Sequence, residues 1–270
     1  MIHILVDSYG CSSDRINNLM DVYEVINKIV NQNDLNAIMP PQLIPYYYCQ
    51  DERDVGISAF VLLQGGHFTI HTFPKWGCYF ADLLCDKFVD KDNIEAFLER
   101  EFPCDSLFIR RIDRDEKLYK EDLGIYQSND FGPHYMIHSH MDKAPTLGEY
   151  MEILDNLPDK AGMHPISRPC VLHDTIQKPT YLSGIAVIAE SHIAMHYNYK
   201  TGEVFMDVFS CKEIADSKYK QAMKELFGGQ DKYEDVCIQR GKRNKQRMDS
   251  QENRHDTHKR WQDVIVGEGK

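Results

Sequence analysis

The chain contains the stretch YLSGIAVIAESHIAMHYNYKTGEVFMDVFSC at residues 181–211, and this stretch repeats an earlier one. Residues 56–86, GISAFVLLQGGHFTIHTFPKWGCYFADLLCD, align with it without a gap. The alignment pairs Ser58 with Ser183, Gly66 with Ser191, His67 with His192, His71 with His196 and Asp82 with Asp207. Because an H-x-x-x-H spacing recurs in the same strand-like context, we predict that the chain holds two copies of one structural unit.

Both copies are predicted to contain the same elements in the same order. Each begins with a short apolar strand, near 2–7 and 134–138, followed by an amphipathic helix. Ser12, Ser13 and Asp14 are candidate caps of the first such helix, whereas Thr146 and Glu149 form a capping-box pattern at the second. The remaining elements are two strands around a turn (58–71 and 78–85; 183–197 and 203–210), a second helix (93–102; 214–227) and a last strand (106–111; 233–240).

This strand–helix–hairpin–helix–strand order predicts an α+β fold in which antiparallel sheets are layered with helices. The first repeat is expected to span 1–125 and the second 131–241, with a linker near 120–132 where GIYQSNDFGP collects turn formers. Residues 242–270 carry eight Lys or Arg against five Asp or Glu. We interpret this segment as a solvated charged tail rather than a binding arm.

Composition limits the partners and the compartment. The 270 residues have a formal charge of −11, which disfavours binding to the phosphate backbone of nucleic acids. No window holds the roughly 18 to 20 apolar residues of a membrane span, and the start MIHILVDSYG does not resemble a secretory signal. We therefore expect a cytoplasmic protein with no membrane partner. The eight cysteines form no C-x-x-C pair and no zinc spacing, which favours reduced thiols.

The second copy carries a specific motif. Glu190-Ser191-His192, with His196 four residues after His192, precedes the run Asp207-Val208-Phe209-Ser210-Cys211. It resembles the prokaryotic S-adenosylmethionine decarboxylase family, which reads E-S-H-x-x-x-H and then D-V-F-T-C. In that family the cysteine lies twenty residues after the serine and another serine lies eight residues before it, as Cys211 and Ser183 do here. The chain thus resembles a fused tandem duplication of this family with a degenerate first copy.

The resemblance implies a cofactor made from the chain itself. Ser191 would attack the carbonyl of Glu190, the ester would eliminate, and the uncut zymogen would become two fragments with a pyruvoyl group in place of the serine. This group would form a Schiff base with the amine of a small amino-acid substrate and accept the electrons released with CO₂. The family assigns proton return to the cysteine matching Cys211 and processing to the histidine matching His196. The pathway implied is polyamine (spermidine) biosynthesis.

The first copy has lost the residues for this chemistry but keeps others. It has Gly66 at the serine position and Asp86 at the cysteine position, with Cys85 one place early, yet Ser58 and His71 remain. The family pairs two units, identical in prokaryotes and fused in eukaryotes, where the processing serine and histidine come from the unit opposite the pyruvoyl. The resemblance therefore implies a composite site of Ser191, Cys211, Ser58 and His71, leaving Ser183 and His196 as vestiges. The alternative, in which His196 acts, stays open at this stage, as does homo-oligomerisation.

Other positions depart from the family's substrate-binding pattern. The family's H-T-x-P-E ends in a glutamate that holds ribose hydroxyls, but this chain has Lys75 and Lys200 there; the adenine-stacking aromatic is replaced by Glu52 and Gln177. S-adenosylmethionine is the default substrate, and arginine or ornithine, paired with Glu52, is the alternative. Substitute stacking groups could be Tyr46, Tyr47, Tyr48, Phe73 or Trp76, but packing in the core or on the surface is the favoured role for these aromatic side chains. A catalytically silent regulatory relative is the non-enzyme alternative.

Structural interpretations also exist for the motif residues. A serine–histidine pair on a strand commonly serves packing, and Cys211 could be a small core side chain. His67 with His71, His192 with His196, and His134 with His138 and His140 have a spacing that puts metal ligands on one strand face. No carboxylate or thiol spacing completes a known metal pattern, so no metal is expected. The chain also lacks the G-x-S-x-G elbow of a serine hydrolase.

Overall fold

The structure is a computed structural model that describes residues 1–46, 52–115, 132–175, 180–189, 191–211 and 214–241. The chain divides into two compact units, Met1–Lys117 and Leu118–Lys270. The predicted linker, apart from Gly132, and the predicted tail at 242–270 lie outside the described residues. Among the residues described, no helix is long and apolar enough to cross a membrane.

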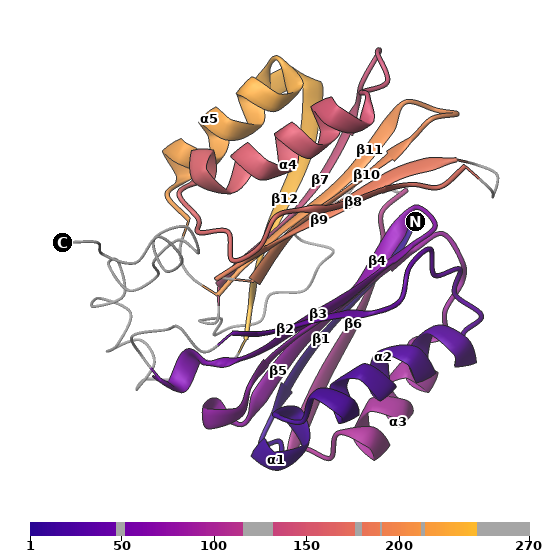
Figure 1. Cartoon of the computed structure of the whole chain (residues 1–270), viewed down its shortest axis with the longest axis vertical. Coiled ribbons are helices and arrows are strands. Elements are labelled where there is room, and N and C mark those ends of the chain that lie inside the picture. The colour runs from indigo at the N-terminus through magenta and orange to yellow at the C-terminus, as the bar shows by residue number, and fades with distance from the viewer. Residues whose placement is uncertain (47–51, 116–131, 176–179, 190, 212–213, 242–270) are drawn as a thin grey trace. The chain divides into compact units, whose positions relative to one another are not determined.

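Unit 1 is one antiparallel sheet covered on one face by helices (Figure 1). Its sheet has six strands in the order β2-β3-β4-β5-β1-β6. In chain order the elements are β1 (Ile2–Tyr9), α1 (Ser13–Ile16), α2 (Leu19–Gln32), β2 (Gln42–Tyr46), η1 (Glu52–Asp54), β3 (Gly56–Leu63), β4 (Gly66–Phe73), η2 (Pro74–Trp76), β5 (Cys78–Cys85), α3 (Lys91–Glu101) and β6 (Ser106–Asp113).

Unit 2 repeats this topology, with strand order β12-β7-β11-β10-β9-β8, which is the order of unit 1 read from the other edge. Its elements are β7 (Gly132–His140), α4 (Leu147–Ala161), β8 (Cys170–His173), β9 (Tyr181–Ile188), β10 (Ser191–Asn198), β11 (Glu203–Ser210), α5 (Asp216–Phe227), η3 (Gln230–Lys232) and β12 (Tyr233–Arg240). The predicted α+β class, with antiparallel sheets layered with helices, is confirmed.

The predicted hairpins were wrong in one respect. The segments 58–71 and 183–197, predicted as single strands, each contain two: β3 and β4 in unit 1, β9 and β10 in unit 2. In unit 1 the turn is made by Gln64 and Gly65, whose φ of +70° is a conformation that glycine adopts readily. In unit 2 the strands separate after Ile188 without a glycine or proline to mark the turn. This correction puts Ser191 at the start of a strand rather than inside one.

Two further elements were missed, and one helix begins differently from the prediction. The short edge strands β2 and β8 were not predicted; Pro45 in β2 is tolerated because this strand lies at a sheet edge. Ser12 caps only the four-residue α1, without a side-chain hydrogen bond. The cap of α2 is Asn18, whose Oδ1 accepts hydrogen bonds from the backbone N–H groups of Met20 (2.9 Å) and Asp21 (3.3 Å).

The capping box predicted for unit 2 is confirmed. The side chain of Glu149 accepts a hydrogen bond from the Thr146 N–H at 2.7 Å, and Thr146 Oγ1 accepts one from the Glu149 N–H at 3.2 Å. Both interactions satisfy N–H groups that the first turn of a helix leaves without partners. The start of α4 is thereby fixed, which orients the helix over its sheet.

Alternation along β10 divides its side chains between the two faces of the sheet. Ile193, Met195 and Tyr197 belong to the apolar core shared with α4 and α5. His192 and His196 therefore lie on the opposite face, because successive strand residues point to opposite sides. Both histidines are buried. The two histidines of the motif are thus separated from the helix-covered core of unit 2.

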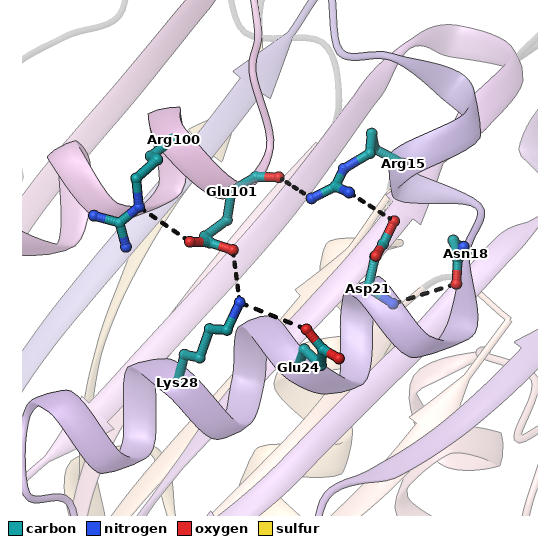
Figure 2. Close-up of polar contacts among 7 residues, drawn as sticks. All are labelled: Arg15, Asn18, Asp21, Glu24, Lys28, Arg100 and Glu101. Carbon is teal, nitrogen blue, oxygen red and sulfur yellow. Dashed lines mark hydrogen bonds and ion pairs between the residues drawn. The ribbon is translucent and has the colours of Figure 1, made fainter.

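Glu101 joins the three helices of unit 1 (Figure 2). Its carboxylate accepts hydrogen bonds from Lys28 Nζ of α2 at 2.9 Å and from Arg100 Nε at 3.1 Å, and its carbonyl accepts one from Arg15 of α1 at 3.0 Å. The hydrogen bond from Lys28 is the largest cause that lowers the pKa of Glu101 from its ordinary value, with Arg100 second. The carboxylate form is therefore favoured in the folded chain.

We predict that Glu101→Gln lowers the midpoint of thermal unfolding at pH 7, and that this difference from wild type shrinks as the pH falls. A carboxyl whose pKa is depressed on folding contributes stability above its unfolded pKa of about 4.3, and the contribution is lost as the pH drops through the folded value. Thermal melts from pH 7 to pH 3 measure it. Glu99→Gln, an exposed position on the same helix, is the control; a difference for Glu101→Gln that is independent of pH would contradict the prediction.

Candidate active site

Ser191 occupies an unusual position at the start of β10. It pairs with Ile188 of β9 on one side and with Ser210 of β11 on the other. The residue is 2% exposed, and its Oγ has no hydrogen-bond partner among the described residues. Its backbone φ is +150°, a value that residues with a side chain rarely adopt. Asp34, at +49°, is the other non-glycine residue with positive φ in the described chain. A buried hydroxyl without a partner on a strained backbone is a candidate nucleophile.

Cys211 lies beside this position. It directly follows Ser210, the residue that pairs with Ser191, and its side chain is buried. The register of β10 on β11 therefore brings the serine and the cysteine to the same end of the sheet in unit 2. They are twenty residues apart along the chain, and the hairpin between them returns the chain to its starting end.

A serine–histidine pair lies farther along β10. Ser183 is directly opposite His196 in the ladder, and Ser183 Oγ is 2.9 Å from His196 Nδ1. Both residues are buried. His196 is five residues from Ser191 on the same strand, which at about 3.3 Å per residue is roughly 16 Å. Within unit 2, the pair is therefore too far from Ser191 for direct proton transfer.

Unit 1 contains the same pair at the equivalent position. Ser58 is opposite His71, with Ser58 Oγ 2.9 Å from His71 Nδ1. Where unit 2 has Ser191, unit 1 has Gly66 as the first residue of β4. Cys85 is the last residue of β5 and packs in the helix-facing core, where burial raises its pKa to about 11. Unit 1 thus keeps the pair but lacks a hydroxyl nucleophile at this strand start.

A buried network that the motif analysis did not identify crosses three strands of unit 2. Arg240 of β12 lies 3.2 Å (Nη1) from His134 Nδ1 of β7, and His134 Nε2 lies 3.6 Å from Asp207 Oδ1 of β11. Because a guanidinium can only donate, His134 Nδ1 accepts, and the histidine proton is on Nε2, facing Asp207. The guanidinium also lies 4.6 Å from the ring centre of Phe209, two residues before Cys211.

Unit 1 has the corresponding network. Arg114 Nη1 lies 3.2 Å from His3 Nδ1, and His3 Nε2 lies 4.0 Å from Asp82 Oδ1. The sequence alignment had already paired Asp82 with Asp207, but the arginines escaped notice because each lies at or just after the end of the last strand, outside the aligned stretch. The duplication of the network shows that it belongs to the architecture of the unit rather than to the serine.

The histidines considered as metal ligands at the far end of β7 have other contacts. His138 stacks on Phe205 with ring centres 4.8 Å apart and has Glu203 Oε1 at 3.6 Å from its Nε2. His140 Nε2 lies 2.9 Å from the Thr201 carbonyl oxygen. These contacts give both side chains a structural role, in stacking and in holding the turn between β10 and β11.

Comparison with known proteins identifies the family of this chain. The family model described as S-adenosylmethionine decarboxylase matches residues 2–115 and 142–241. The chain belongs to the S-adenosylmethionine decarboxylase family, a family of carboxy-lyases. The resemblance inferred from the motif is thereby confirmed.

Two relatives that match this chain are each about half as long as it is. The S-adenosylmethionine decarboxylase proenzyme of Thermoplasma volcanium is 31% identical over 127 residues, which are 47% of this chain and 92% of the relative. That of Thermoplasma acidophilum is 29% identical over 134 residues, 49% of this chain and 95% of the relative. A solved structure, the adenosylmethionine decarboxylase of Aquifex aeolicus, covers 44% of this chain and 96% of its own at 23% identity, with a TM-score of 0.35. The family match over two segments and the shares covered by the two Thermoplasma proenzymes are consistent with a tandem duplication of one decarboxylase-like unit.

Two of the departures from the family's nucleoside-binding pattern are at the surface of the described chain. Lys75 in η2 and Lys200 in the turn after β10 are exposed. Trp76 donates a hydrogen bond from Nε1 to Asp54 at 3.0 Å, and Arg53 lies 4.8 Å from its ring centre, so one face of the indole is already covered. Phe73 packs edge-on against Phe80 with ring centres 6.1 Å apart. Glu190, Gln177, Tyr47 and Tyr48 and the side chain of Glu52 lie outside the described residues, and Tyr46 is half-buried.

We predict that Arg240→Met lowers the free energy of unfolding by roughly 3 kcal/mol, because it removes the cation from the buried network of Arg240, His134 and Asp207. Urea unfolding of unprocessed protein measures this. Arg168→Met is the matched control in the same unit: Arg168 pairs with Asp155 at 2.7 Å but is 60% exposed, so its loss should cost less than about 1 kcal/mol. Equal losses for the two variants would show that burial does not decide the contribution of Arg240.

Proposed function

We propose that this chain is a self-processing, pyruvoyl-dependent decarboxylase of the S-adenosylmethionine type that acts in polyamine biosynthesis. The observation that carries the proposal is the start of β10, where the buried Ser191 hydroxyl has no partner among the described residues and the backbone has a φ of +150°. Cys211, which carries a thiol, directly follows Ser210, the residue that pairs with Ser191. Family membership supplies the chemistry that such a serine supports.

Processing uses atoms of the chain itself. Ser191 Oγ attacks the carbonyl carbon of Glu190, the carbon–nitrogen bond breaks, and the hydroxyl proton passes to the Ser191 nitrogen, which leaves an ester. Removal of the Ser191 Cα proton then breaks the Cβ–Oγ bond and releases the Glu190 carboxylate. The dehydroalanine that remains tautomerises to an imine, which adds water and loses ammonia. The products are residues 1–190 and a second fragment, 191–270, that begins with a keto group.

The residues near Ser191 fit a pyruvoyl group at that position. Such a group supplies an acceptor for the electron pair released with CO₂. Cys211 is assigned the return of a proton to the product carbon, a role that a thiol performs when it lies next to the reacting carbon. The strand register supports this assignment because it pairs Ser191 with Ser210, the residue directly before Cys211.

His71 is assigned the proton transfer of ester breakdown. A general base must lie within about 3 Å of the proton that it moves, or reach it through one water. His196 lies roughly 16 Å along β10 from Ser191, by the rise of a strand. Its counterpart His71 forms the same serine–histidine pair in unit 1, at the same 2.9 Å. The role is therefore given to the remaining serine–histidine pair of the proposed set, in which Ser58 orients His71.

The substrate is a small amino acid, with S-adenosylmethionine first by family membership. Arginine or ornithine is the second candidate, because the position that holds a ribose-binding glutamate in the family is the exposed Lys75 here, and a cation cannot accept hydrogen bonds from hydroxyls. Assays of CO₂ release with each of the three substrates separate the candidates. Release from S-adenosylmethionine alone would remove the second one.

The intact mass of purified protein tests the processing step. We expect two fragments, 1–190 and 191–270, for wild type, and one 31.4 kDa chain for Ser191→Ala. Cys211→Ala should still be cut but decarboxylate about 10²- to 10⁴-fold more slowly, the usual contribution of a general acid. Controls in the same unit are Ser139→Ala and Cys170→Ala, which should be cut and active. Wild-type protein that is folded but uncut would refute the proposal in favour of a silent regulatory relative.

His71→Gln and His196→Gln test the assignment of the processing base. Glutamine can still hydrogen-bond to the facing serine but cannot transfer a proton at neutral pH. We expect His71→Gln to slow fragment formation by about 10²-fold or more, whereas His196→Gln stays within a few-fold of wild type. A time course by gel, on variants whose circular dichroism matches wild type, measures both. The reverse order of effects would transfer the role to His196.

A further inference from the structure

The strained backbone of Ser191 has a structural origin that the first unit reveals. Gly66 stands where unit 2 has Ser191, at the start of the equivalent strand. A Cβ on Gly66 would lie 1.9 Å from the carbonyl oxygen of Leu84 and 2.7 Å from its carbonyl carbon. Because both atoms belong to the backbone of β5, they cannot move aside as a flexible side chain would. An ordinary L-residue is therefore excluded at this strand start.

The same carbonyl approach is expected in unit 2. His67 pairs with Leu84 in unit 1, and His192 pairs with Phe209 in unit 2, so the two strand starts have the same register. The Phe209 carbonyl then corresponds to that of Leu84. Unit 1 accommodates this carbonyl with a glycine whose φ lies outside the strained range, whereas unit 2 has a serine at φ +150°.

We propose that the Phe209 carbonyl forces Ser191 into its strained conformation, so that the uncut chain stores strain at the peptide that is to be cleaved. Cleavage needs the Ser191 hydroxyl, so unit 2 cannot avoid the strain with a glycine, as unit 1 does with Gly66. The inference about processing rests on the proposed function, but the strain itself does not. Phe209 thus acts as a positioning residue, through its backbone, on Ser191.

The strain is released by the first covalent step. The φ angle of Ser191 is restrained because its nitrogen is bonded to the Glu190 carbonyl carbon. When Oγ takes over that carbon and the nitrogen becomes a free amine, the restraint ends, while the numbers of atoms and electrons are unchanged. Later loss of the Cα proton makes Cα planar, so that Cβ no longer projects from a tetrahedral centre. The strain therefore favours the ester over the peptide that it replaces.

Two uncleavable variants measure the strain without reference to cleavage. In ordinary strand positions glycine is less stable than alanine. At position 191 we expect the opposite order, with the unfolding equilibrium constant of Ser191→Gly at least tenfold smaller than that of Ser191→Ala, in urea at pH 7. The same pair of substitutions at Ser106, the first residue of β6, made in the uncleavable Ser191→Gly chain, is the matched control and should show the ordinary order. A Ser191→Ala chain that fails to fold while Ser191→Gly folds is the extreme form of the expected result.

A second substitution tests the source of the strain. Gly66→Ala should raise the unfolding equilibrium constant by at least tenfold, because its Cβ would meet the Leu84 carbonyl. Alanine as stable as glycine at position 66, the ordinary order at position 191, or a Ser191→Gly chain that does not fold would each overturn the inference. Wild-type protein that stays uncut would instead count against the proposed function, and would leave the comparison of Ser191→Gly with Ser191→Ala valid.

Discussion

The pairing of β10 with β11 is the constraint on which the site depends. It sets Ser191 opposite Ser210, so that Ser191 and Cys211 lie at the same end of the sheet although twenty residues separate them along the chain. A slip of one residue would move the side chains of β10 to the other face of the sheet, taking His192 and His196 into the apolar core with α4 and α5. Because Ile193, Met195 and Tyr197 fill that core, the slip is strongly opposed. The packing of ordinary apolar residues thus fixes the geometry of the reactive ones.

Comparison of the two units distinguishes the features of the shared fold from those of the proposed reaction. Both have the same strand order, the same serine–histidine pair at 2.9 Å and the same arginine–histidine–aspartate network. They differ where the proposed reaction takes place: Gly66 against Ser191, and Asp86 against Cys211. The shared features therefore cannot by themselves be specific to catalysis. Unit 2 differs by the hydroxyl of Ser191, at a strand start whose counterpart in unit 1 has no room for a Cβ, and by the thiol of Cys211 at the same end of the sheet.

Sequence alone predicted the family, the α+β class and the equivalent residues of the two repeats. These predictions depend on motif spacing and on alternation along strands. It failed at the turn between β9 and β10, since Ala189 and Glu190 carry no turn signal and the apolar pattern continues past them. It also missed Asn18 as the cap of α2, because Ser12 offered an equally good cap six residues earlier. Arg240 was missed for a different reason: its partner His134 is distant in sequence, and only the pairing of β12 with β7 brings them together.

The persistence of Ser183 and His196 in unit 2 has a physical explanation that needs no role in the reaction. Both side chains are buried, and each satisfies the other's hydrogen-bonding group. Loss of either one alone would leave a buried polar atom without a partner, which costs about 1–3 kcal/mol. Replacing both together with apolar residues of the same shape would be nearly neutral, but it requires two simultaneous changes. On the proposed assignment of processing to His71, packing alone retains Ser183 and His196 in unit 2, and the presence of the pair in both units does not show that both pairs act.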